Sequence, residues 1–90
     1  MRFEWDSNKA LANLRKHYVS FEEASSAFRD NFSATTRDPD HSESEDRFVT
    51  FGVSSRGRLL AISHTERGNS IRIISARLAT NMERRIYEEG

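Results

Sequence analysis

The chain has 90 residues, no cysteine, and 14 basic and 14 acidic residues, which give a formal net charge of zero. This length suits a single domain over residues 1–90 with one core, and a chain without cysteine has neither disulfides nor thiolate metal sites. No apolar run approaches the roughly 20 residues that span a bilayer, and the first residues lack the basic and apolar regions of a signal peptide. We therefore expect a cytoplasmic protein without a membrane partner.

The sequence begins with the pattern of a short strand and a helix. Residues 3–5 are expected to form the strand, and Asp6 or Ser7 can cap a helix that runs to about His17. Asn13 falls on the polar side of this helix. Its predicted buried side chains recur at three- and four-residue steps: Ala10, Leu11, Leu14 and Tyr18.

A second helix is expected directly after the first. Ser20 and Glu23 have the spacing of a capping box, so the helix should start at Ser20. Its predicted buried face consists of Phe21, Ala24 and Phe28. Both helices are too short to be stable alone, and we expect them to form a hairpin that packs on the rest of the domain.

From residue 33 onward the apolar positions alternate, which is typical of strands. We predict strands over residues 33–37, 47–54, 58–65 and 70–77, with a polar loop that contains the only proline between the first two. Short turns with glycine join the last three strands, so they should form an antiparallel meander.

A last helix should complete the domain. Thr80 and Glu83 form a second capping box, and Ala79, Met82 and Ile86 are expected to face inward. The predicted fold class is therefore α+β, with an N-terminal helical hairpin, an antiparallel meander and a C-terminal helix.

Charge is distributed unevenly along this order of elements. Residues 38–46 contain five acids and no basic residue, whereas residues 47–87 contain eight arginines, two acids and no lysine. A guanidinium group matches two phosphate oxygens at once. The pattern therefore favours an RNA or DNA ligand; the alternative is a solvated basic surface.

Alternation along the strands suggests which side chains meet. His64 and Glu66 share one face of their strand, and Arg77 alternates with Arg72 on the next strand. Opposed side chains of a hairpin lie about 5 Å apart. We therefore expect His64 and either Arg72 or Arg77 to converge on one ligand in a hollow open to solvent, with the choice of arginine left open by the unknown register.

The ordered motifs of the chain resemble the BrnT toxins of bacterial type II toxin-antitoxin systems. The resemblance covers nearly the whole sequence and includes Phe3-Glu4-Trp5-Asp6 with Asn8-Lys9, Asn13-Leu14 with Lys16-His17, Val19-Ser20-Phe21-Glu22-Glu23-Ala24, Asp38-Pro39-Asp40-His41-Ser42, His64-Thr65-Glu66-Arg67-Gly68, Ile71-Arg72-Ile73-Ile74-Ser75-Ala76-Arg77, and Thr80, Glu83, Arg84, Arg85 and Tyr87-Glu88. It implies a RelE-like fold, cytosolic ribonuclease activity that inhibits translation and growth, and a hetero-oligomer with a BrnA-like antitoxin that binds DNA and represses the operon.

One position departs from the family pattern. Members usually have a basic residue after Ser-Ala-Arg, whereas this chain has Leu78. The missing cation can attenuate the toxin, or Leu78 can simply lie against the core. The competing interpretation of the whole chain is a non-catalytic binding module that acts as a co-repressor with its antitoxin.

Metal-independent ribonuclease chemistry assigns roles to four residues. Attack of the ribose 2′-hydroxyl on the adjacent phosphate needs a base, an acid and fixed positive charge. His64 is the candidate base or acid because imidazole titrates near neutral pH, and Glu66 can orient it or act as the base. Arg77 supplies positive charge, and Tyr87 can transfer a proton or stack on a base. The alternative for His64 is a structural hydrogen-bonding role.

Further residues are candidates for RNA binding. Arg72, Arg67 and the exposed Lys9 can contact the backbone, and Trp5 can stack on a base or pack against the core. We expect neither a metal nor a cofactor. His41 with Asp38 and Asp40 could form a metal site, but tight-turn chemistry is the simpler explanation of this segment.

Overall fold

A computed structural model describes residues 1–38, 40 and 45–90. Their elements follow one another in the order β1 (Arg2–Glu4), α1 (Ser7–His17), α2 (Phe21–Ala27), β2 (Ala34–Arg37), β3 (Arg47–Val53), β4 (Leu59–Arg67), β5 (Ser70–Leu78) and α3 (Asn81–Glu89). Pro39 and His41, and with them most of the predicted acidic loop, lie outside the described residues. The α+β class is confirmed.

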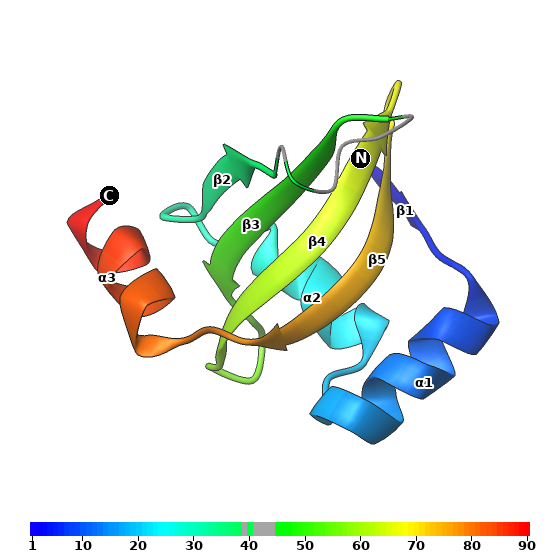
Figure 1. The fold of residues 1–90 in the computed structure, drawn as a ribbon, viewed down its shortest axis with the longest axis horizontal. Coiled ribbons are helices and arrows are strands. Elements are labelled where there is room, and N and C mark those ends of the chain that lie inside the picture. Colours follow the sequence, from blue (N-terminus) through cyan, green and yellow to red (C-terminus); the bar gives the residue numbers. More distant parts are fainter. Residues whose placement is uncertain (39, 41–44) are drawn as a thin grey trace.

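The strands form one mixed sheet in the order β1-β5-β4-β3-β2 (Figure 1). Strands β2 to β5 are an antiparallel meander, as predicted. The N-terminal strand, however, pairs in parallel with β5, with Phe3 opposite Ile71. The sheet is therefore antiparallel except at this edge. Because a long stretch of chain connects β1 to β5, β1 can join β5 in either direction.

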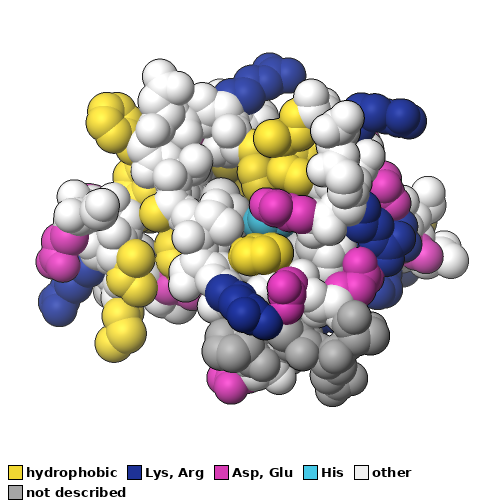
Figure 2. Space-filling model, turned by 90° about the horizontal axis from the view of Figure 1, so that it is seen from above, with side chains coloured by type: hydrophobic (Ala, Val, Ile, Leu, Met, Phe, Trp, Pro, Cys, Tyr) yellow, Lys and Arg dark blue, Asp and Glu magenta, His cyan; other side chains and the backbone are white. Residues whose placement is uncertain are grey.

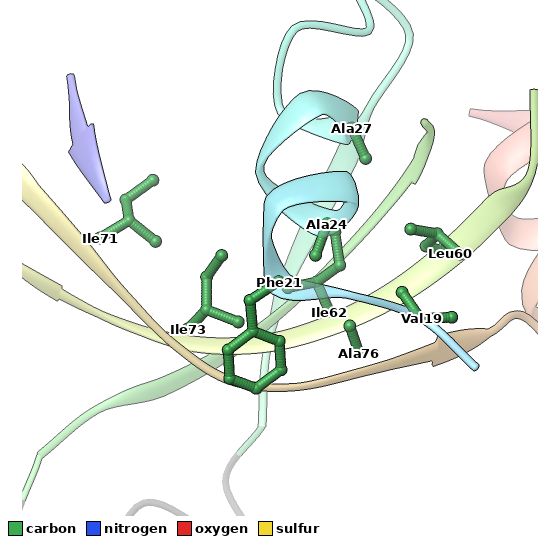
Figure 3. Close-up of a cluster of buried hydrophobic side chains, with 9 residues drawn as sticks. All are labelled: Val19, Phe21, Ala24, Ala27, Leu60, Ile62, Ile71, Ile73 and Ala76. Carbon is green, nitrogen blue, oxygen red and sulfur yellow. The ribbon is translucent and has the colours of Figure 1, made fainter. Parts of the chain in front are cut away.

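One face of the sheet carries the hydrophobic core. Helix α2 packs across β3, β4 and β5 behind the sheet in the view of Figure 1. Figure 3 shows its side chains meeting those of the strands. The cluster consists of Val19, Phe21, Ala24, Ala27, Leu60, Ile62, Ile71, Ile73 and Ala76. We call this side the core face, and the opposite side, which carries Arg47, Arg72 and Arg77, the arginine face.

Helix α1 protects an edge of the sheet rather than burying an apolar stripe. Because β1 pairs only with residues 70–72 of β5, the backbone around Ala76 would otherwise be an open edge. The Asn13 amide donates to the carbonyls of Ala76 (2.8 Å) and Val19 (2.9 Å) and accepts from the Ala76 N–H (3.1 Å). Asn13 is 7% exposed, whereas Leu11 and Leu14 are 54% and 44% exposed. Of the predicted apolar stripe, Ala10 does pack against the core, but the prediction is wrong for Leu11, Leu14 and Tyr18.

The ends of the first two helices follow local signals. The Asp6 carboxylate caps α1 and Ser20 caps α2, as expected. Tyr18 ends α1 in the left-handed region, with φ 58°, and is exposed. The Glu23 carboxylate accepts hydrogen bonds from Arg58 and Ser54, so this member of the predicted capping box is used for tertiary contacts. Each helix packs mainly on the sheet.

Helix α3 lies beside β3, at the end of the sheet opposite α1 (Figure 1). The predicted capping box between Thr80 and Glu83 is present. Met82 and Ile86 are 75% and 50% exposed, so the prediction that they face inward is wrong. Polar contacts hold the helix instead: Glu83 binds Arg77 and Tyr87 binds Asp30.

Candidate RNA-binding and active site

His64 lies inside the core face and not in an open hollow. It is 1% exposed, with its ring stacked on Phe48 at 5.9 Å and edge-on to Phe28 at 5.0 Å between centroids. Its Nε2 shares a 2.7 Å hydrogen bond with the Thr50 hydroxyl, and Nδ1 has no partner among the described residues. Burial lowers the pKa of His64 from 6.5 to about 4, so the imidazole is neutral at pH 7. The expectation of a solvent-reachable His64 is wrong.

A bulge in β5 decides where the arginines lie. The register between β4 and β5 shifts at Ser63 and His64, which leaves Ile74 as an extra residue on β5. Regular alternation would have placed Arg72 and Arg77 on opposite faces. With the extra residue, Arg72 lies opposite Thr65 and Arg77 opposite Ala61, and both arginines point to the arginine face.

The same register separates the arginines from the predicted acid–base residues. His64 lies opposite Ile73, and Glu66 opposite Ile71, on the core face. The predicted convergence of His64 with Arg72 or Arg77 is therefore wrong. Glu66 is exposed at the end of β4, beside Met1 and Arg2.

Side chains from four strands form one row across the arginine face. Arg47 of β3 lies opposite Thr65 of β4, Thr65 opposite Arg72 of β5, and Arg72 beside Glu4 of β1. The Arg72 guanidinium donates to the Glu4 carboxylate at 3.0 Å. Thr65 is 4% exposed, and in the described structure its hydroxyl oxygen makes no hydrogen bond. Two arginine residues thus flank Thr65 in the pairing register.

Glu45 lies near the end of this row. Its carboxylate accepts two hydrogen bonds from Arg67, at 2.7 and 3.1 Å. Hydrogen bonding from Arg67, and to a smaller extent the charges of Arg72 and Arg47, lower the pKa of Glu45. This carboxylate therefore remains ionised at neutral pH among three guanidinium groups.

The other end of the arginine face meets α3. Arg77 binds Glu83 through two hydrogen bonds of 2.7 and 3.0 Å. The bond from Arg77 lowers the pKa of Glu83, and the same contact raises the pKa of Arg77. Tyr87 follows Glu83 by four residues, so both side chains lie on the same face of α3. The Tyr87 hydroxyl donates a hydrogen bond of 2.6 Å to the Asp30 carboxylate, and this bond raises the pKa of Tyr87.

Trp5 packs on the core side of the sheet, whereas Lys9 lies beside the edge of β5, where it lines a hollow with Ile74 and Ser75. Trp5 is half-buried and packs edge-on against Phe21 at 5.9 Å, where α1 and α2 border a groove. Lys9 is exposed on α1, near Lys16. Across residues 1–38, 40 and 45–90, no three His, Asp or Glu side chains come close enough to hold a metal ion.

Leu78 lies at the border of the core. Its side chain is 53% exposed at the end of β5, opposite the buried core residue Leu60. It therefore lies on the opposite face of the sheet from Arg77.

Three residues of the arginine face escaped sequence reasoning: Thr65, Glu83 as a partner of Arg77, and Glu45. Each becomes visible only through the register or through a contact between elements. Arg72 and Arg77 are also paired with carboxylates. On the side of the molecule that Figure 2 shows, basic and acidic side chains likewise lie next to each other rather than in one continuous basic patch.

None of the described helices is long and apolar enough to cross a membrane. Among curated proteins, no sequence matches the chain. The crystal structure of the ribonuclease toxin BrnT from Brucella abortus matches with a TM-score of 0.65 at 20% identity, over 90% of this chain and 99% of that chain. The fold of the two proteins is therefore the same.

Residues 5–83 match the family model described as the ribonuclease toxin BrnT of type II toxin-antitoxin systems. Toxins of such systems have an antitoxin partner, and a ribonuclease has RNA as its substrate. Since the match covers most of the sequence, this chain belongs to the BrnT family of ribonuclease toxins.

Proposed function

We propose that this toxin is a metal-independent endoribonuclease that binds RNA on its arginine face and cleaves it beside Arg77. Residues 1–90 act as one toxin domain in the cytoplasm. The observation that carries the proposal is the bulge in β5, which brings Arg72 and Arg77 to the same face of the sheet. Their partners Ala61 and Thr65 are four residue steps apart along β4, a span of about 13 Å. One RNA strand can contact both arginines across this distance.

Arg77 supplies fixed positive charge in this scheme. A phosphate that takes the Arg77 guanidinium displaces the Glu83 carboxylate. This removes the hydrogen bond that is the main cause of the lowered pKa of Glu83, so the released carboxylate is a stronger base. Glu83 then accepts the proton of the 2′-hydroxyl, whose oxygen forms a bond with phosphorus. The guanidinium stabilises the charge that develops on the phosphoryl oxygens.

Tyr87 completes the proton transfers. Its raised pKa keeps the phenol protonated, so it can donate to the departing 5′-oxygen as the bond from phosphorus to that oxygen breaks. The products are a 2′,3′-cyclic phosphate and a 5′-hydroxyl. His64 and Glu66 transfer no proton in this scheme, because they lie on the core face.

Cleavage of a short RNA by the purified protein tests the proposal. We expect cleavage in the presence of EDTA, and no cleavage when a single 2′-deoxy residue replaces the ribose at the cut. Arg77→Ala should reduce the rate by about 10² to 10³. Arg85→Ala, which removes an exposed arginine of α3, is the matched control and should cleave like the unmodified protein.

Two results would contradict this scheme. Loss of cleavage in EDTA with recovery on addition of a divalent cation would overturn metal independence. An unchanged rate for a folded Arg77→Ala protein would remove Arg77 from the site. The melting temperatures of both variants show whether Arg77→Ala unfolds the protein by removing the Arg77–Glu83 contact. A slower cleavage rate at an unchanged melting temperature is then a loss of chemistry.

We further propose that the antitoxin is a BrnA-like, DNA-binding protein that forms a hetero-oligomer with this chain. The exposed apolar side chains Met82 and Ile86 on α3 support a protein partner, since monomeric proteins rarely expose such clusters. Co-expression should relieve growth arrest and yield a stable complex. Arrest that persists despite co-purification would contradict neutralisation by that partner.

A further inference from the structure

We infer that Arg47, Thr65 and Arg72 form a binding site for a phosphodiester group of RNA, separate from the cleavage position at Arg77. The identity of the ligand as RNA rests on the proposed function. The site itself rests on the pairing register, which places these three residues in one row on β3, β4 and β5.

The buried hydroxyl of Thr65 is the observation that points to a ligand. Thr65 is 4% exposed, and its oxygen has no hydrogen-bond partner among the residues of the described chain. A buried hydroxyl without a partner costs roughly 1 to 3 kcal/mol, so such a group needs an explanation. A phosphate oxygen that arrives between the two guanidinium groups accepts this hydrogen bond.

The neighbouring arginines have the chemistry that a phosphate needs. Opposed side chains on adjacent strands have Cβ atoms about 5 Å apart, so Arg47 and Arg72 approach Thr65 from either side. Guanidinium groups bind phosphate oxygens through charge-assisted hydrogen bonds. The row thus offers donors from three strands to one tetrahedral anion.

Carboxylates of the chain itself occupy these donors. Glu4 binds Arg72, and Glu45 binds Arg67 within electrostatic reach of Arg47 and Arg72. The Arg72–Glu4 side chains are 34% and 41% exposed, and the Arg67–Glu45 side chains are 47% and 42% exposed. Exposed ion pairs of this kind are weak. An RNA phosphate can therefore displace the carboxylates, and Glu45 acts as its internal competitor.

The position of the row assigns it to binding rather than to chemistry. It lies about 13 Å from the Arg77 row along β4. A phosphate held there fixes the path of the strand across the sheet, while the reacting phosphate lies at Arg77. Thr65, Arg47 and Arg72 are thus positioning residues for the RNA.

Fluorescence anisotropy with a labelled 2′-O-methyl oligonucleotide tests the site, because this probe binds without being cut at a 2′-hydroxyl. Thr65→Val should weaken binding about 10-fold, the effect of one hydrogen bond to a charged group, without lowering the melting temperature. Glu45→Gln should bind more tightly than the unmodified protein. Arg85→Ala is the control for a lost surface arginine.

The outcomes separate this inference from the proposed function. Unchanged affinity of Thr65→Val would overturn the site, and so would a lowered melting temperature, because the hydroxyl would then have a structural partner. Thr65-dependent binding by a protein that cuts no RNA would support the site and contradict the cleavage scheme. If the protein cleaves RNA but its binding does not depend on Thr65, the cleavage scheme is supported and the Thr65 site is contradicted.

Discussion

Acidification should destabilise this protein through His64. Burial in the folded protein keeps the imidazole neutral by lowering its pKa to about 4, whereas the ordinary pKa of an exposed histidine is 6.5. Between these two values the unfolded chain binds a proton that the folded chain does not, so the free energy of unfolding falls as the pH falls. From pH 7.5 to pH 5 the loss is about 2 kcal/mol, since one pKa unit corresponds to about 1.4 kcal/mol.

The variant His64→Gln should remove this dependence. Glutamine can keep a hydrogen bond to Thr50 but does not titrate, so the variant is less stable at pH 7.5 and loses less stability on acidification. Urea unfolding at several pH values between 5 and 7.5 measures both effects. This window lies above the usual carboxylate pKa values, which limits their contribution.

His17→Gln is the matched control, because it removes the histidine at the end of α1 and leaves His64 in place. It should retain the full loss of about 2 kcal/mol between pH 7.5 and pH 5. Equal slopes for the unmodified protein and His64→Gln would refute the reasoning, since His64 would then titrate alike in the folded and unfolded chains.

The remaining predictions concern buried contacts and are measured as changes in the urea midpoint. Glu23→Gln should lower the free energy of unfolding by about 2 to 3 kcal/mol, because it breaks an ion pair with Arg58 in which the Glu23 side chain is only 5% exposed. A loss smaller than that caused by the same substitution at an exposed glutamate would contradict this role. Gly52→Ala should cost about 3 kcal/mol, because a Cβ atom would lie 2.6 Å from the Ala27 carbonyl oxygen. Gly57→Ala, with φ +78° and open space around it, should cost only about 1 kcal/mol, and the opposite order would be evidence against the close approach.

Local signals predicted the elements of this fold well. The caps at Asp6, Ser20 and Thr80 depend on a few neighbouring residues, and all three are present. Strand alternation and the glycine turns likewise depend on short stretches of sequence. The antiparallel order of β2 to β5 follows from them directly.

Periodicity predicted burial correctly for Phe21 and Ala24 of α2, but not for α1. Periodicity favoured Leu11 and Leu14 as the inner side of α1, yet the helix turns Asn13 toward the sheet. The reason is the unpaired backbone around Ala76, which an amide side chain satisfies and a leucine does not. This backbone is unpaired because β1 ends before it reaches Ala76. Since that depends on how two distant strands pair, no pattern within α1 reveals it.

In the candidate site, a single residue limits what the sequence pattern can predict. Period-two alternation correctly placed His64 with Glu66, but it set Arg72 and Arg77 on opposite faces and left open which of them joins His64, whereas the structure places both on the face opposite to His64. The error comes from the single extra residue Ile74, because one inserted residue reverses the face of every side chain after it. The bulge therefore places two arginines that alternation sets apart on the same face of the sheet. Deletion of Ile74 should consequently impair RNA binding more than replacement of Ile74 by valine, which keeps the bulge.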